Sequence, residues 1–142
     1  MRTHSATKPR EERRRSDRVL RVLIVDDERD TVATLKAVLE DEGYVVLGVL
    51  TGAEVLPAVR SFRPDAVILD ISVPGMSGYA VAQAIRHSFT DMRRPLVVGI
   101  SGVWKQPPDR LVARQVGFDH YLVKPCDPAI LIYLLESLKR PS

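Results

Sequence analysis

Five polar residues stand at the ends of hydrophobic segments in this sequence, and their types point to phosphoryl chemistry. They are Asp26, Asp27, Asp70, Ser101 and Lys124. If the segments form a parallel sheet, all five side chains gather at one edge of that sheet. Three neighbouring carboxylates repel one another, and a hard cation with oxygen ligands relieves the repulsion. Mg²⁺ fits best, because it tolerates one or two carboxylates together with water and phosphate oxygens.

Asp70 is the residue that we expect to react. With a cation bound, one carboxylate can attack phosphorus and form an aspartyl phosphate. The transferred phosphoryl group has three equatorial oxygens whose charge must be neutralised. Mg²⁺, Lys124 and the Ser101 hydroxyl would take one oxygen each. We favour Asp70 as the acceptor because a loop rich in Ser, Pro and Gly follows it and leaves room for a phosphate donor.

The elements that must position these residues alternate between strands and helices. The apolar pattern predicts strands over 19–27, 44–50, 65–70, 95–101 and 119–124. It predicts helices over 29–43, 52–62, 77–89, 108–117 and 127–140, the second of them interrupted by its proline. Gly43 should end the first helix, and Asp127 should cap the last one ahead of Pro128.

This alternation defines the expected fold class. Strands that are nearly continuous runs of Val, Ile and Leu are typical of a parallel sheet covered on both faces. The sequence therefore predicts an α/β protein with a five-stranded parallel sheet and helices on both faces, in a fivefold βα order. Ligands of such sheets bind at the carboxyl ends of the strands, where the five polar residues are expected.

Charge divides the chain of 142 residues into a basic tail and a nearly neutral domain. Residues 1–18 contain seven Lys or Arg and three Asp or Glu, whereas residues 19–142 contain fourteen and fifteen. The tail has almost nothing to bury, so we expect residues 1–18 to be a flexible basic segment and 19–142 to be one domain. Contact of the tail with nucleic acid, acidic lipid or an acidic partner is the less favoured alternative.

The composition also bears on the compartment. The single cysteine, Cys126, cannot form an internal disulfide, which fits a reducing environment and favours the cytoplasm. No apolar run reaches the roughly 18 residues that span a bilayer, and the N-terminus lacks the apolar core of a secretory signal. The three histidines show no spacing typical of metal ligands. We therefore expect a cytoplasmic protein without a membrane span.

Four segments resemble the receiver domain of two-component response regulators. They are LIVDDE at 23–28, DAVILDISVPGMSG at 65–78, LVVGIS at 96–101 and GFDHYLVKP at 117–125. Together they place five functional positions of the family in the right order, and the resemblance extends over roughly 19–140. It implies a flavodoxin-like fold of the CheY type. It also implies that Asp70 is phosphorylated from a phosphohistidine of a sensor histidine kinase or of a histidine phosphotransfer protein.

The resemblance implies roles for individual residues as well. Mg²⁺ would be held by Asp27, Asp70 and the backbone carbonyl of Ser72, with Asp26 acting through water. Ser101, where the family often has Thr, would move toward the phosphoryl group. Tyr121 occupies the family's aromatic switch position and would follow Ser101 inward.

Two further implications concern the neighbouring loops. The peptide bond between Lys124 and Pro125 is expected to be cis. Ser72 and Val103 sit where the family varies the lifetime of the phosphate, so that lifetime stays open. Val73 stands where the family often has Met.

The functional prediction is a stand-alone signalling module. Phosphorylation would shift a two-state equilibrium, with output by partner binding or by a phosphorelay. We expect autodephosphorylation and no enzymatic turnover. The downstream protein is unknown, nucleic acid is not expected as a partner, and a homodimer is compatible with the sequence.

Two other functions compete with this prediction. A phosphatase of the haloacid dehalogenase type uses the same groups, but its nucleophile follows the first strand in a D-x-D pattern. Here the candidate follows the third strand, and Ser72 stands two residues after Asp70. A receiver-like scaffold that is never phosphorylated is the other alternative. Simpler roles also exist for individual residues: Asp26 and Asp27 could cap a helix, and Tyr121 could be a core aromatic.

Overall fold

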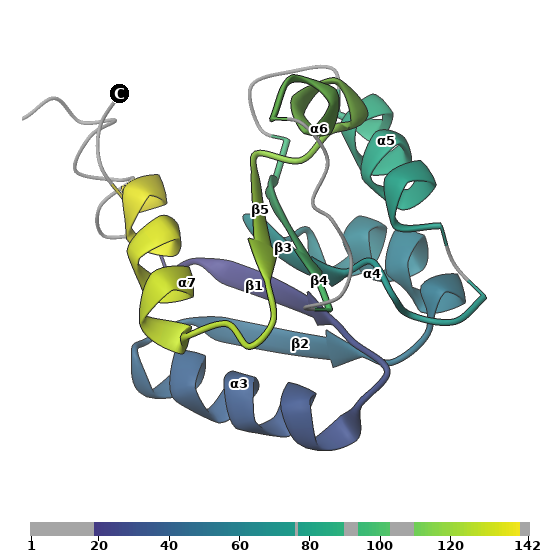
Figure 1. Cartoon of the computed structure of the whole chain (residues 1–142). Coiled ribbons are helices and arrows are strands. Elements are labelled where there is room, and N and C mark those ends of the chain that lie inside the picture. Colours follow the sequence, from purple (N-terminus) through teal and green to yellow (C-terminus); the bar gives the residue numbers. More distant parts are fainter. Residues whose placement is uncertain (1–18, 76, 90–93, 103–109, 140–142) are drawn as a thin grey trace, which may run out of the picture.

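The computed structural model describes residues 19–75, 77–89, 94–102 and 110–139 (Figure 1). The predicted basic tail, Val103 and Trp104 lie outside these ranges. Five parallel strands form one sheet, in the order β2-β1-β3-β4-β5. The strands are β1 (Arg21–Val25), β2 (Val45–Val49), β3 (Ala66–Asp70), β4 (Leu96–Ser101) and β5 (His120–Val123). The strand order changes direction at β1, so the β1/β3 boundary is the switch point where such sheets bind ligands.

In the described part of the chain, five α-helices cover the two faces of this sheet (Figure 1). One face carries α3 (Arg29–Asp41) and α7 (Pro128–Glu136), and the other carries α4 (Val55–Phe62), α5 (Gly78–Ser88) and α6 (Arg110–Val116). Short 3₁₀ turns lie at Gly52–Glu54 and Ser137–Lys139. This confirms the predicted fold class.

Each face of the sheet has its own hydrophobic core. Leu23, Val67 and Leu69 point toward α4 and α5, whereas Ile24 and Ile68 point toward α3 and α7. Successive strand residues therefore enter opposite cores, and all five residues of β3 are buried. Double coverage explains why these strands read as continuous apolar runs. It also gives the strand ends a rigid support.

The helix ends follow the predicted signals. As predicted, Asp127 caps α7 by accepting a hydrogen bond from Ala129 N at 2.9 Å. Ser77, whose cap we did not predict, caps α5 by accepting one from Ala80 N at 3.3 Å. Gly43 follows α3 with φ of +98°, a conformation that costs glycine little. These local signals place the helices without reference to the rest of the fold.

Three details differ from the prediction. Strands β1 and β5 end at Val25 and Val123, so the two acids and Lys124 belong to the loops that follow rather than to the strands. The last helix ends at Glu136 and continues as a 3₁₀ turn. Pro57 does not interrupt α4, because it is the third residue of that helix, where a backbone N–H has no partner within the helix.

Among the described residues, no helix has both the length and the apolar character that crossing a membrane requires.

Two adjacent residues of α7 should differ sharply in their contribution to stability. Leu131 is 2% exposed and packs in the core shared with α3, whereas Ile130 is 47% exposed. We expect Leu131→Ala to lower the free energy of unfolding by about 2–5 kcal/mol, because it leaves a cavity. Ile130→Ala should cost less than about 1 kcal/mol. Urea unfolding of both variants measures the difference, and equal losses would contradict this packing of α7.

Candidate functional site

The three predicted carboxylates meet at the carboxyl edge of the sheet. The register pairs Val25 of β1 with Leu69 of β3, so the residues that follow them lie side by side. Carboxylate oxygens of Asp26, Asp27 and Asp70 all lie within 4.8 Å of one another. Asp26 and Asp70 are only 4% and 3% exposed, whereas Asp27 is exposed. The edge therefore holds two buried acids and one that faces solvent.

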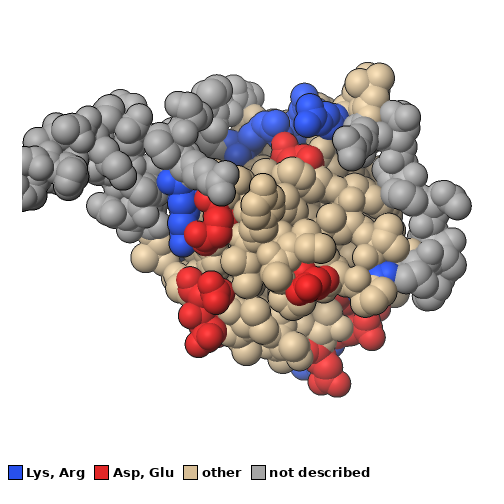
Figure 2. Space-filling model, turned by 60° about the vertical axis from the view of Figure 1, so that its left-hand side comes forward, with Lys and Arg blue, Asp and Glu red and all other residues tan. Residues whose placement is uncertain are grey.

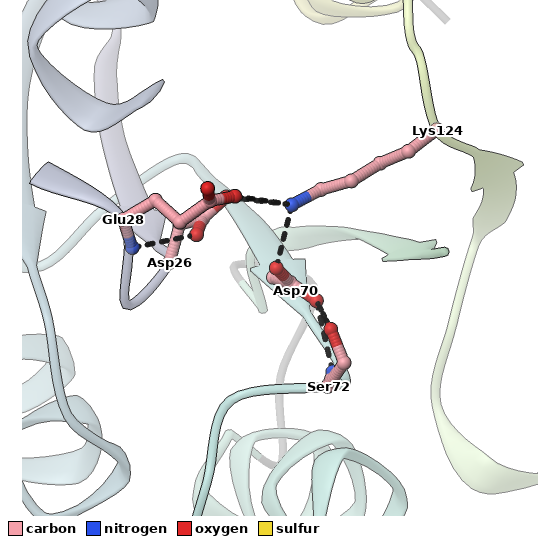
Figure 3. Close-up of polar contacts among 5 residues, drawn as sticks. All are labelled: Asp26, Glu28, Asp70, Ser72 and Lys124. Carbon is pink, nitrogen blue, oxygen red and sulfur yellow. Dashed lines mark hydrogen bonds and ion pairs between the residues drawn. The ribbon is translucent and has the colours of Figure 1, made fainter. Parts of the chain in front are cut away.

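Lys124 reaches across from the loop after β5 and bridges the buried acids (Figure 3). Its Nζ lies 2.8 Å from Asp70 Oδ2 and 3.1 Å from Asp26 Oδ2. Glu28 joins the same ammonium, with its Oε1 at 3.7 Å. We did not predict this role for Glu28, although the residue lies within the LIVDDE segment. A single ammonium therefore serves three carboxylates.

Ser72 contacts the other oxygen of Asp70. Its hydroxyl and its backbone N–H both donate to Asp70 Oδ1, at 2.5 and 2.8 Å (Figure 3). Both oxygens of Asp70 are thus hydrogen-bonded, one to Ser72 and one to Lys124. The described contacts of Ser72 involve its N–H and hydroxyl, so the predicted metal contact through its carbonyl stays a prediction.

The carboxyl groups of the site differ in their pKa values. Burial raises the pKa of Asp70, but hydrogen bonds from Lys124 and Ser72 outweigh it, so the net shift is downward. Burial keeps the pKa of Asp26 above its ordinary value, with the charge of Asp70 acting in the same direction. For Lys124, burial lowers the pKa, yet both aspartates more than compensate and raise it. Asp70 is therefore ionised at neutral pH beside a firmly protonated lysine.

Ser101 ends β4 next to this cluster. It follows Ile100, the register partner of Asp70, and its side chain is fully buried. Its hydroxyl makes no hydrogen bond within the described part of the chain, and the same is true of the buried Tyr121 hydroxyl. Burial raises the pKa of Tyr121 to about 12, while the nearby Ser101 hydroxyl acts in the opposite direction.

The sequence-predicted residues are thus found together. Asp26, Asp27, Asp70 and Lys124 form one cluster, Ser72 contacts Asp70, and Ser101 stands on the adjacent strand. The peptide bond between Lys124 and Pro125 is cis, as the resemblance implied. Their chemical roles stay predictions.

A doubly wound parallel sheet with an acidic site at its carboxyl edge defines the general class, an α/β protein of the flavodoxin-like, CheY type. The sequence matches the response regulator receiver domain over residues 22–136. The chain therefore belongs to the family of response regulator receiver domains, as the resemblance indicated.

Solved structures agree with this assignment. A receiver domain (CheY-like) from Methylobacillus flagellatus is 30% identical with a TM-score of 0.74, and the match covers 85% of this chain and 99% of that one. The chemotaxis response regulator CheY4 of Vibrio cholerae is 27% identical with a TM-score of 0.70, covering 85% and 99% of the two chains.

Longer proteins are also similar. The transcriptional regulatory protein PrrA of Mycobacterium tuberculosis is 37% identical over 120 residues, which are 84% of this chain and 50% of PrrA. The DNA-binding response regulator MtrA of Mycolicibacterium paratuberculosis is 34% identical over 112 residues, or 79% and 48% of the two chains. This chain thus spans about half the length of the curated relatives it matches.

The ion pair of Asp70 has a consequence for pH dependence. Because the folded pKa of Asp70 is lowered, its carboxylate stabilises the fold above the pKa of the unfolded chain. That stabilisation is lost as the pH falls through the lowered folded value.

Removing the lysine should move this transition. In Lys124→Met we expect the pKa of Asp70 to rise, because burial then acts without the opposing ammonium. Carboxyl-carbon NMR titration measures the shift. Arg94→Met is the control, since Arg94 pairs with Asp119 at 3.5 Å instead. An Asp70 titration that is the same in Lys124→Met and the parent would show that the ion pair does not set this pKa.

Proposed function

We propose that this receiver domain accepts a phosphoryl group on Asp70 from a phosphohistidine of a sensor histidine kinase or a histidine phosphotransfer protein. The observation that carries the proposal is the arrangement around Asp70. A buried, ionised carboxylate stands beside Lys124 and among further acids at the carboxyl edge of the sheet.

The acidic cluster fits Mg²⁺, which we propose as the cofactor. Asp26, Asp27 and Asp70 supply hard oxygen donors within 4.8 Å of one another, and one of the three is open to solvent. The Ser72 carbonyl is proposed as a further ligand on the family resemblance. When bound, Mg²⁺ would offset the surplus negative charge and hold a phosphoryl oxygen. Lys124 can neutralise only one of the three aspartate carboxylates. The two remaining negative charges favour the binding of a divalent cation.

The residues of the chain have distinct parts in the transfer. An Asp70 carboxylate oxygen attacks phosphorus, and the bond from phosphorus to the imidazole nitrogen of the donor breaks. The bonding electron pair returns to that nitrogen. The Lys124 ammonium, which now contacts Asp70, would shift to a phosphoryl oxygen. The Ser101 hydroxyl, which is buried and has no hydrogen bond among the described residues, would donate to another oxygen.

The consequence of phosphorylation would be a conformational change. Ser101 and Tyr121 are the proposed switch residues, since both hydroxyls are buried without a hydrogen-bond partner among the described residues. The Ser101 hydroxyl also lowers the pKa of Tyr121, against the larger effect of burial. Engagement of Ser101 by a phosphoryl group would alter the surroundings of the Tyr121 hydroxyl. We propose that the change is read by a downstream protein or in a phosphorelay, in the cytoplasm, and that the domain autodephosphorylates without acting as a turnover enzyme.

Nucleic acid is not part of this proposal. On the face that Figure 2 shows, the described basic side chains form small groups beside acidic ones and do not make a continuous basic surface. Phosphate backbones are bound by extended clusters of Lys and Arg. DNA binding is named for the relative MtrA, of which this chain covers about half.

Phosphorylation by a small donor tests the proposal. We expect acetyl phosphate with Mg²⁺ to add one phosphoryl group to the chain, detected by intact mass. Asp70→Asn should show no adduct, whereas Asp41→Asn, which changes an exposed acid on α3, should behave like the parent. An adduct that persists in Asp70→Asn would exclude Asp70 as the acceptor.

Magnesium binding can be measured without phosphorylation. Mg²⁺ at ten times its dissociation constant should stabilise the fold by about 1.4 kcal/mol, which raises the temperature of thermal unfolding. Asp27→Asn should abolish most of this shift because it removes the exposed ligand of the cluster. In the absence of Mg²⁺ the same variant should not be less stable, since it removes charge repulsion. A full Mg²⁺ shift in Asp27→Asn would show that the ion binds elsewhere.

A further inference from the structure

Three aromatic rings connect the start of α5 to Tyr121. Tyr79, the second residue of α5, meets Phe118 edge to face, with ring centroids 5.7 Å apart and planes at 83°. Phe118 meets Tyr121 of β5 in the same way, at 5.4 Å and 86°. Edge-to-face pairs at this spacing are favourable beyond the area they bury. The rings thus link a helix on one side of the sheet to the proposed switch residue.

Gly99 of β4 makes this arrangement possible. A Cβ atom at Gly99 would lie 2.7 Å from Phe118 Cε1 and 3.1 Å from Tyr121 Cδ2. Both rings therefore occupy space that any other residue at position 99 would fill. Phe118 is 2% exposed and belongs to the core beneath α4 and α5. The ring of Phe118 is therefore tightly packed. Any movement of Phe118 would change its contact with Tyr121.

The ring contacts matter because hydrogen bonding does not orient Tyr121. Its hydroxyl is buried and has no hydrogen-bond partner within the described residues. A buried hydroxyl without a partner is unfavourable, so the inward position of this side chain must be supported by its ring. Tyr79 also raises the pKa of Tyr121, although burial is the main cause of that shift.

Tyr79 is itself linked to the loop behind Asp70. Its neighbour Gly78 packs against Ile71 so closely that a Cβ at position 78 would lie 2.5 Å from Ile71 Cγ2. Ile71 directly follows Asp70. A displacement of this loop would therefore reach the first turn of α5, and with it the ring of Tyr79.

We propose that Tyr79 and Phe118 are positioning residues that hold Tyr121 turned into the molecule beside Ser101. They thereby couple the loop after Asp70 to the switch through a contiguous set of packed rings. The consequence for signalling rests on the proposed function, whereas the placement of Tyr121 does not.

Fluorine NMR of the full chain labelled with 3-fluorotyrosine tests the placement. Each resonance is assigned by a single Tyr→Phe change, and the solvent isotope shift reports how exposed the Tyr121 ring is. Tyr79→Ala removes the edge-to-face contact that supports Phe118. It should lower the ratio of buried to exposed Tyr121 by up to about two- to twelvefold, the value of one such contact. Tyr79→Phe keeps the ring and should resemble the parent. Tyr133→Ala is the control, because Tyr133 is 66% exposed on α7 and outside this set of rings.

A second measurement separates this inference from the proposed function. The affinity for beryllofluoride with Mg²⁺, a phosphoryl analogue, should fall in Tyr79→Ala by the same factor as the buried population of Tyr121. Suppose that beryllofluoride binds neither the parent nor Tyr79→Ala, but Tyr121 still becomes exposed in Tyr79→Ala. The positioning role of Tyr79 then stands, and the proposed role of Asp70 as phosphoacceptor fails. If Tyr121 stays equally buried in folded Tyr79→Ala and Phe118→Leu, the rings are core packing only and the inference is overturned.

Discussion

Burying two carboxylates side by side is unfavourable, and Lys124 is the group that offsets this cost. Asp26 and Asp70 are nearly inaccessible to solvent, and each places an oxygen on the same ammonium. An uncompensated buried charge would shift its pKa and neutralise. The lysine instead keeps Asp70 ionised, while Asp26 is less well compensated. The site therefore combines a carboxylate ready to react with a charge imbalance that a cation can relieve.

The rest of the fold serves to hold these groups at fixed positions. Asp26 follows β1 and Asp70 ends β3, and these two strands are adjacent in the sheet and buried on both faces. Lys124 comes from the loop after β5, two strands away from β3, so its long side chain must span the edge. Because the strands are packed between two cores, their ends cannot drift apart. A site built at the carboxyl ends of four strands can therefore be held without a bound ligand.

The two faces of the sheet contribute differently to the proposed function. The face under α3 and α7 carries Ile24 and Ile68, which precede Asp26 and Asp70 by two residues and so lie on the same side of their strands. The face under α4 and α5 carries Phe118 and Tyr121, packed over Gly99. The acids are thus supported from one side, while the aromatic rings lie on the other. Ser101, at the end of β4, stands next to both.

The sequence by itself determined the elements and the principal site residues. Apolar runs ending in Asp, Ser and Lys are local features, as is the predicted cap at Asp127, and each can be recognised within a few residues. Parallel pairing then brings every strand end to one edge, which is why Asp26, Asp27, Asp70 and Lys124 could be grouped without a structure. Element boundaries were less well determined, since periodicity does not mark where pairing stops.

Only the tertiary structure decided the contacts between distant segments. The share of Glu28 in the Lys124 ion pair depends on where a long, exposed side chain lies, and no pattern in the sequence fixes that. The Ser72 hydroxyl on Asp70 depends on the backbone path of the loop. Phe118 and Tyr121 pack over Gly99 for two reasons. The register of β4 with β5 places Tyr121 beside Gly99, and the missing side chain of Gly99 leaves room for both rings. Such contacts depend on three-dimensional packing, whereas periodicity and caps are written along the chain.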